Sequence, residues 1–175
     1  KDGADGQGAG ASNQSNIPIE TMEAEQPIVV EEYGFIQDTE GAGEFRGGMG
    51  TRRSYRYTQD DTLVQVRSDR MKFPPFGVNG GDDALPTRIF FNDDQQERSK
   101  FIETVPAGTV LSVDMPGAGG WGNPLDRDPD LVLDDFIQEK ISAKRAREKY
   151  GVVVDETERT VNFEDTKILR ENMGR

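Results

Sequence analysis

Short runs of apolar residues, most of them alternating with polar ones, occupy the first two thirds of the chain and predict β-strands. The runs span residues 28–36, 52–57, 64–68, 87–91, 100–105 and 109–114. In the second run, alternation places Arg53, Tyr55 and Tyr57 on one face of the strand. Asp60 and Asp61 supply a turn after it, so we expect the second and third strands to pair as a β-hairpin.

Beyond these strands the apolar residues recur at helical spacing. Asp128 and Pro129 form an N-cap and a first-turn proline, and Ser142 can cap a second short helix that ends at Gly151. Asn162 opens a last helix, with Ile168, Leu169 and Met173 on one side. We therefore predict an α+β fold, with a mostly antiparallel β body and glycine-rich loops followed by two or three C-terminal helices.

These patterns divide the chain into three expected parts. Residues 1–16 contain no hydrophobic residue larger than alanine, and we expect an extended arm there, rich in Gly, Ser and Asn, that packs against a partner. Residues 17–127 are expected to form a β-rich domain, and residues 128–175 a C-terminal helical segment.

Several large side chains lie beside glycines or prolines, and each allows two interpretations. Trp121, in the glycine-rich loop 116–128, either fills the core of a tight strand-to-helix connection or meets a ligand or a neighbouring polypeptide. Arg46 either forms a surface ion pair or grips a carboxylate at an interface. Phe73 and Phe76 flank two prolines and either enter the core or dock on a partner.

Composition narrows the classes of partner. Only 33% of the 175 residues are apolar, which predicts a modest core, and the net charge is −12. That charge argues against nucleic acid or an anionic membrane as a partner, because both would repel the chain. No apolar run is long enough to span a membrane and no segment resembles a signal peptide, so we expect a cytoplasmic location.

The chain contains no cysteine and no histidine. Disulfides, thiolate metal sites and imidazole-dependent catalysis are therefore excluded within it. The remaining candidates for acid–base chemistry are carboxylates, but Asp126, Asp128 and Asp130 are typical of loop and helix-cap residues. We predict that this chain alone has no catalytic residues and no metal ligands.

Five motifs, in the same order along nearly the whole chain, resemble the C-terminal part of the hydantoinase B/oxoprolinase family. They are Asn-x-x-Asn-Ile-Pro-Ile-Glu (13–20), Gly-Ala-Gly-Glu-Phe-Arg-Gly-Gly-Met-Gly (41–50), Ser-Asp-Arg-x-x-Phe-Pro-Pro-Phe-Gly (68–77), Pro-Gly-x-Gly-Gly-Trp-Gly-x-Pro-Leu-x-Arg-Asp-Pro (116–129) and Ala-Arg-x-x-Tyr-Gly-Val-Val (146–153). Two positions depart from the family pattern: Ala118 stands where glycine is commoner, and Trp121 where tyrosine is commoner.

The resemblance implies a subunit or segment of the B-type component of an ATP-dependent enzyme, with its glycine loops at one end facing the rest of that enzyme. It implies opening of a cyclic amide such as a hydantoin, 5-oxoproline or a lactam, or alternatively carboxylation of a ketone such as acetone or acetophenone. We favour amide opening. A non-catalytic scaffold domain is a third hypothesis. The implied partners are the remainder of the B-type component and a hydantoinase A-type, ATP-binding component, with ATP and a divalent metal bound elsewhere in the complex.

The positions within these motifs also suggest binding or interface residues, without any role in bond breaking. These candidates are Asn13, Asn16, Arg46, Arg70, Phe76 and Trp121.

Overall fold

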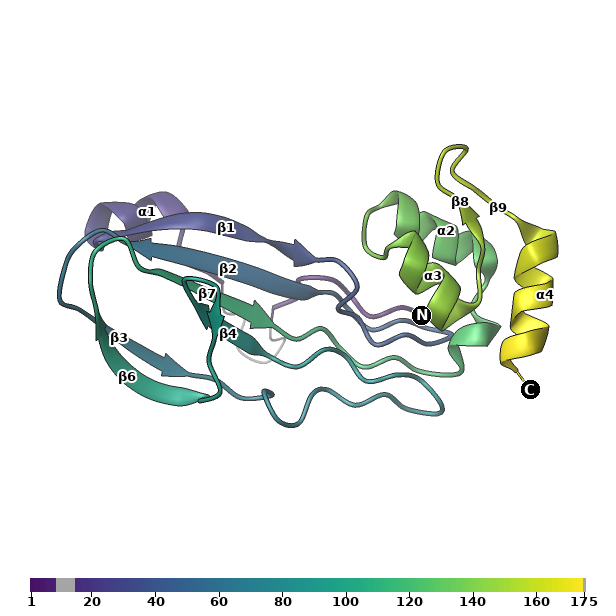
Figure 1. Ribbon diagram of the computed structural model, residues 1–175, viewed down its shortest axis with the longest axis horizontal. Coiled ribbons are helices and arrows are strands. Elements are labelled where there is room, and N and C mark those ends of the chain that lie inside the picture. The colour runs from purple at the N-terminus through teal and green to yellow at the C-terminus, as the bar shows by residue number, and fades with distance from the viewer. Residues whose placement is uncertain (9–14, 175) are drawn as a thin grey trace.

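The computed structural model describes residues 1–8 and 15–174 and has an elongated shape. A β body forms one end and a group of helices the other, and long loops run side by side between them (Figure 1). This arrangement matches the expected α+β class, with a mostly antiparallel sheet and helices that lie mainly in the C-terminal part. The glycine loops, however, lie in the middle of the molecule, between the β body and the helices, not at one free end.

The β body is made of antiparallel strands in two sheets. The larger sheet has the strand order β1-β2-β7-β4-β5, and β3 pairs with β6 in the smaller one. The strands of the larger sheet are β1 (Ile28–Ile36), β2 (Gly50–Tyr57), β7 (Val110–Met115), β4 (Arg88–Phe91) and β5 (Asp94–Gln95), and those of the smaller sheet are β3 (Thr62–Arg67) and β6 (Lys100–Val105).

The expected hairpin between the second and third strands is wrong. β2 pairs with β1 on one side and β7 on the other, so neither of its edges is open to β3. The segment after β2 instead crosses to the second sheet, where Val64 and Val66 are buried in one cluster with Tyr57 and Leu111 of the larger sheet. Covering the apolar face of the larger sheet buries more hydrophobic surface than an edge pairing would, which accounts for the crossover.

The predicted C-terminal helices form with the predicted caps. Asp128 accepts a hydrogen bond from the Asp130 N–H at the start of α2 (Pro129–Ile137), and Ser142 caps α3 (Ala143–Tyr150). Gly151 ends α3 with a φ of 61°, a left-handed conformation that favours glycine, and α4 (Phe163–Met173) follows its Asn162 cap. Between α3 and α4 lies a short hairpin of β8 (Val154–Asp155) and β9 (Thr160–Val161), and a 3₁₀ turn, η1 (Pro124–Asp126), precedes α2.

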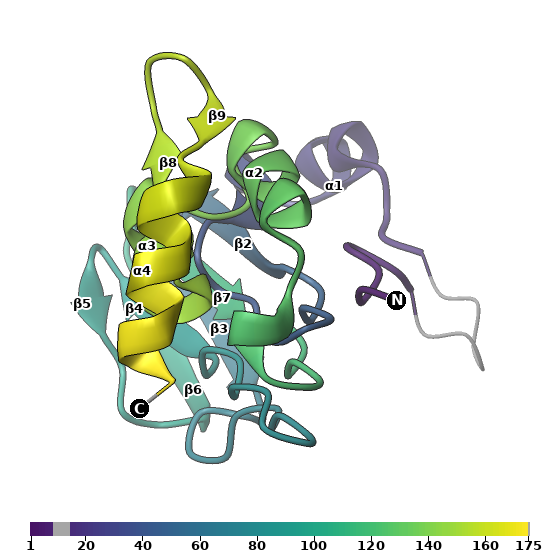
Figure 2. The same ribbon diagram turned by 90° about the vertical axis from the view of Figure 1, so that its right-hand side faces the viewer.

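Figure 2 looks onto this helical end, where α2, α3 and α4 are gathered. A second hydrophobic cluster, which contains Val132, Ile141, Tyr150 and Val152, holds α2 and α3 together. One helix, α1 (Ile19–Glu25), was not expected from the sequence. It lies beside β1 and has no buried residue, so the sequence contains no apolar stripe that would predict it. Among the described residues, no helix is long and apolar enough to cross a membrane.

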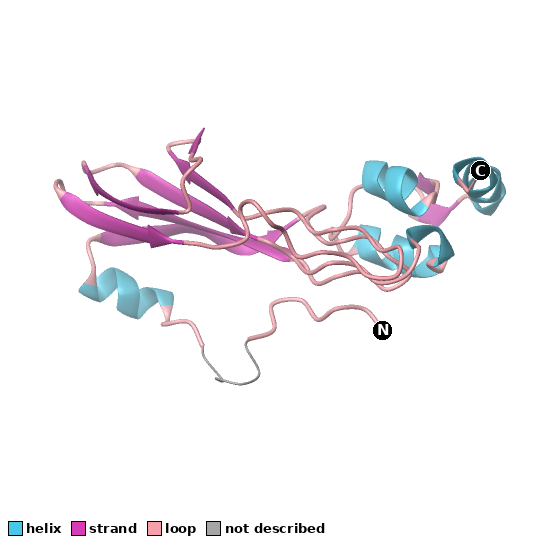
Figure 3. Ribbon diagram, turned by 90° about the horizontal axis from the view of Figure 1, so that it is seen from below, coloured by secondary structure: helices cyan, strands magenta, loops and turns pink. Residues whose placement is uncertain are grey.

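Extended segments pack backbone against backbone between the two ends, as the pink loops of Figure 3 show. We call this region the glycine bundle and define it as residues 39–50, 76–84 and 116–122. Hydrogen bonds join the three segments, among them Gly41 N–H to the Ala118 carbonyl at 2.9 Å and Gly120 N–H to the Asp82 carbonyl at 3.0 Å. A Cβ on Gly47 would lie 1.7 Å from the Ala118 carbonyl oxygen, so glycine is required there by the close approach of the two chains.

Candidate functional site

The structure does not gather the predicted contact residues into one site. Asn13 lies outside the described residues. Asn16 borders a pocket on the larger sheet, Arg46 is buried at the helical end of the glycine bundle, and Phe76 and Trp121 lie on the surface of the bundle. Arg70 is exposed; its backbone has a φ of 62°, and its carbonyl accepts a hydrogen bond from the Thr87 N–H at 3.1 Å.

Arg46 belongs to a buried network of charged side chains. Its Nε donates to Asp135 Oδ1 at 2.8 Å, and its Nη atoms donate to both oxygens of Asp5 at 3.0 and 3.1 Å. Arg127, which is only 1% exposed, donates to Asp135 Oδ2 at 2.7 Å and to both oxygens of Asp2 at 2.7 and 2.8 Å. The network therefore ties the N-terminal arm, the glycine bundle and α2 together.

Both interpretations of Arg46 are accordingly wrong in part. Arg46 grips carboxylates, but they belong to its own chain, and the ion pairs are buried instead of superficial. Burial raises the pKa of Asp5, but hydrogen bonds from Arg46, the Met49 N–H and Lys140 outweigh it and lower the pKa to about 2. Asp5 is therefore ionised at neutral pH, and Arg46 serves the fold.

The aromatic residues of the bundle lie on its surface. The Trp121 backbone pairs with Phe45 in a β-bridge, yet its indole is 45% exposed and rests on the Phe45 ring, with 5.7 Å between centroids. Trp121 therefore does not fill the core. Phe73 and Phe76 are 71% and 70% exposed, so they do not enter the core either. That these side chains dock on a partner stays a prediction.

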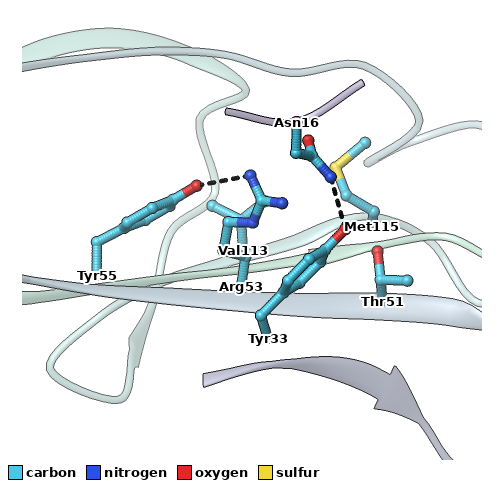
Figure 4. Close-up of a pocket in the computed structure, with 7 residues that line it drawn as sticks. All are labelled: Asn16, Tyr33, Thr51, Arg53, Tyr55, Val113 and Met115. Atoms are coloured by element: carbon cyan, nitrogen blue, oxygen red, sulfur yellow. Dashed lines mark hydrogen bonds between the residues drawn. The ribbon is translucent and has the colours of Figure 1, made fainter. Parts of the chain in front are cut away.

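The pocket beside Asn16 lies on the face of the larger sheet that also carries the β-body core. It has a volume of about 380 Å³, and seven residues from the N-terminal arm, β1, β2 and β7 line it (Figure 4). They are Asn16, Tyr33, Thr51, Arg53, Tyr55, Val113 and Met115. None of these described lining residues is acidic, and most of their polar groups can donate hydrogen bonds, so the chemistry of the pocket suits an anion better than a cation.

Arg53 is the only charged residue among the seven that line this pocket. Its guanidinium carbon lies 4.0 Å from the centroid of the Tyr33 ring, and its Nη1 donates to the Tyr55 hydroxyl at 3.2 Å. Burial lowers the pKa of Arg53, but the Tyr55 and Tyr33 hydroxyls outweigh it and the pKa is raised. The pocket therefore presents a permanent positive charge on an aromatic support.

Sequence reasoning missed the buried carboxylates, among them Asp135 and Glu40. Asp135 follows Val132 by three positions, on the apolar face of α2, which is a signal that the sequence already held. Glu40 is fully buried and accepts from Arg145 Nε at 2.6 Å and from the Tyr150 hydroxyl at 3.1 Å. Burial raises the pKa of Glu40 in spite of Arg145. Nothing local in the sequence marks Glu40, because its partners lie more than 100 positions away.

Within residues 1–8 and 15–174, no group of three or more acidic side chains is placed to hold a metal ion. The chain also has no histidine or cysteine. The structure thus contains a buried ion network that stabilises the fold, an exposed aromatic surface, and a pocket whose lining suits an anion.

Comparison with known proteins places this geometry among related chains. The family model described as hydantoinase B/oxoprolinase matches residues 1–124. An uncharacterised protein of Methanocaldococcus jannaschii is 38% identical over 160 residues, which are 89% of this chain and 28% of that protein. The putative B-type subunit of a D-/L-hydantoinase from Pseudomonas sp. strain NS671 is 30% identical over 97% of this chain and 29% of its own length.

Two solved structures share the fold. An ATP-dependent caprolactamase from Pseudomonas jessenii superposes with a TM-score of 0.74 and 27% identity, over 88% of this chain and 28% of that one. A nucleotide-free acetone carboxylase superposes with a TM-score of 0.76 and 21% identity, over 90% of this chain and 26% of that one. The chain thus spans less than a third of the length of each of these proteins.

Proposed function

Because this chain belongs to the hydantoinase B/oxoprolinase family, we propose that it is a subunit or segment of the B-type component of an ATP-dependent enzyme that opens cyclic amides. The observation that carries the proposal is the extent of the match to the putative B-type hydantoinase polypeptide. The alignment takes in 97% of this chain but only 29% of the relative, so the chain corresponds to a part of a larger component.

The residues of the chain support a role that depends on other polypeptides. It holds no imidazole or thiol, and its charged network is occupied with binding its own arm and helices. Among its exposed aromatic residues, Phe73 and Phe76 belong to the motif 68–77 and Trp121 to the motif 116–129. We propose that Phe76 and Trp121, with Asn16 and Arg70, contact the remainder of the B-type component.

The choice between amide opening and ketone carboxylation rests on sequence identity. The putative hydantoinase polypeptide is 30% identical and the caprolactamase 27% identical, whereas the acetone carboxylase is 21% identical. At 21%, the likeness supports a shared fold and no more. We therefore favour a hydantoin, 5-oxoproline or lactam as substrate and keep ketone carboxylation as the alternative.

The proposal leaves ATP and the divalent metal to other parts of the assembly. We propose that ATP is bound by a hydantoinase A-type component and that the remainder of the B-type component supplies the metal ligands. The cytoplasm, where ATP is available, is the proposed location.

Reconstitution tests this function. The chain is expressed with the remainder of the B-type component and the A-type component of the same genome, and ATP hydrolysis is followed with caprolactam, hydantoin or 5-oxoproline, and with acetone plus bicarbonate. We expect one of the amides to stimulate ATP hydrolysis and ring opening only when this chain is present. Full turnover without the chain would contradict the proposal, and stimulation by acetone alone would establish the carboxylase alternative.

A further inference from the structure

The pocket of Figure 4 is lined mainly by residues of β1, β2 and β7 in the larger sheet. The smaller sheet packs over the part of the inner face that holds Tyr57 and Leu111. Nearer the glycine bundle, the same face carries Tyr33 and Met115, which are each 49% exposed. The pocket is therefore open to solvent beside a well-packed core, and most of its lining residues stand on paired strands.

Strand register places Arg53 at the centre of the pocket. Tyr33 of β1 and Val113 of β7 are its direct neighbours across the sheet. The Tyr33 ring supports the guanidinium from one side, while the Tyr55 hydroxyl fixes Nη1 at 3.2 Å. Asn16 Nδ2 donates to the Tyr33 hydroxyl at 2.7 Å and so holds the ring in turn. The guanidinium is preorganised before any ligand arrives.

The neighbouring arginines of β2 form ion pairs with carboxylates, whereas Arg53 does not. Arg52 binds Asp114 through two hydrogen bonds of 2.6 and 2.9 Å, and Arg56 binds Glu31. Among the described residues, Arg53 has no carboxylate within ion-pair distance, although the chain contains 33 acidic residues. Residues 9–14 contain no Asp or Glu either. An arginine held in place without a counter-ion in an acidic protein indicates that its counter-ion comes from outside the chain.

We propose that the Arg53 pocket binds a carboxylate group supplied from outside this chain. The guanidinium nitrogens not used by Tyr55 can donate to the two carboxylate oxygens, and the Thr51 hydroxyl is a further donor in the lining. Val113 and Met115 form an apolar wall that suits the methylene groups next to the carboxylate. The carboxylate has two possible sources: a small molecule, or an Asp or Glu side chain of another polypeptide. The inference rests on the pocket and does not require the proposed function.

The first arm of the test uses the full chain alone. Arginine Nε–H signals and the backbone amide signals of the pocket residues Thr51 and Val113 are followed by NMR during titration with sodium acetate and sodium hexanoate, at constant ionic strength, with acetamide as the neutral probe. The amide signals report binding in the variants that lack Arg53. We expect a saturable shift of the Arg53 signal with both carboxylates and none with acetamide. R53Q should weaken hexanoate binding at least about tenfold, and R53K, which retains charge but not the bidentate donor geometry, severalfold. R67Q, at an exposed position of β3, is the matched control and should leave binding unchanged.

The second arm identifies the source in the assembly with the remainder of the B-type component. If the carboxylate is a protein side chain, R53E should weaken association at least about tenfold whereas R67E does not. If it is a small molecule, R53E should abolish the acetate response and leave association unchanged. The proposal is overturned if acetate shifts Arg53 and Arg67 alike, or not at all, and R53E also leaves association unchanged. Circular dichroism of R53E and R53K is the control for folding. R53K retains a cation beside the Tyr33 ring, so if R53E lost association only because it misfolded, its spectrum would differ from that of R53K.

Discussion

Asp135 joins two deeply buried arginines through one carboxylate. One of its oxygens accepts from Arg46 and the other from Arg127. Each arginine also binds an aspartate of the N-terminal arm, Asp5 or Asp2. A buried ion pair costs desolvation energy when it forms, but removing one partner leaves an uncompensated charge and is far more costly.

Asp135→Asn should therefore destabilise the fold by about 3 kcal/mol, because Arg46 and Arg127 both lose a charged acceptor. Chemical denaturation of the full chain measures the change. Asp134→Asn is the matched control, since the neighbouring Asp134 is exposed on the same helix and should shift stability by less than about 0.5 kcal/mol. Equal effects of the two substitutions would refute a structural role for the network.

Asp5 makes part of this stability depend on pH. Its pKa is about 2 in the folded chain, against a usual value of 3.8. Between these values the unfolded chain binds more protons, so the stability from Asp5 is complete above about pH 5 and is lost as the pH falls toward 2. We expect Asp5→Asn to remove roughly 1 kcal/mol of that pH dependence, an amount reduced for solvent screening. Denaturation curves at several pH values measure it; unchanged pH dependence would contradict the assignment.

At the level of single residues, sequence reasoning was only partly able to find the sites. Asn16 was predicted as a contact and lies at the pocket, and Arg53 was placed on the correct face of its strand. Arg53 could not be singled out, because its isolation from carboxylates depends on which strands flank β2. Arg46 was found by its glycine neighbours, but its partners lie in the arm and in α2, far away in sequence.

The glycine bundle is the element on which the shape depends. Its segments approach so closely that side chains cannot fit between them: a Cβ at Gly47 would meet the Ala118 carbonyl oxygen, and one at Gly120 would lie 2.1 Å from the Ala42 carbonyl oxygen. Packing in this region therefore rests on backbone hydrogen bonds instead of side-chain burial.

Gly47→Ala should destabilise the chain by about 3 kcal/mol or more, because neither backbone segment can shift without breaking its hydrogen bonds. Gly34→Ala provides the control: Gly34 lies in β1, and a Cβ there would have no atom within 4 Å among the described residues. That substitution should be neutral or slightly stabilising, since alanine loses less backbone entropy than glycine on folding. Thermal unfolding of the two variants measures the contrast, and similar melting temperatures would show that the bundle tolerates side chains.

Elements were predicted better than their pairing. The strands over 28–36 and 100–105 and the caps of α2, α3 and α4 form at the residues expected, because alternation and capping are local signals. The hairpin prediction failed because alternation does not say which sheet a strand joins. α1 was missed because it has no buried residue and therefore no periodic apolar pattern. The glycine bundle was misplaced because a glycine indicates that another segment approaches closely but does not indicate which segment it is.

The whole molecule is long and narrow and exposes aromatic side chains along its middle. Phe76→Ala should weaken association with the remainder of the B-type component at least about tenfold, because the exposed ring would be buried in that interface. The fold of the chain itself should be unaffected. Leu63→Ala, at an equally exposed position on β3, serves as the control. Surface plasmon resonance with the immobilised remainder of the component measures both; equal affinities for Phe76→Ala and the unsubstituted chain would exclude this contact.

The central claim is that this chain completes a larger component, and native mass spectrometry tests it most directly. The chain is mixed with the remainder of the B-type component and the A-type component of the same genome and sprayed from a non-denaturing buffer. We predict one assembly that contains all three polypeptides in fixed ratio. A chain that stays monomeric while the other two assemble and turn over substrate without it would contradict the account.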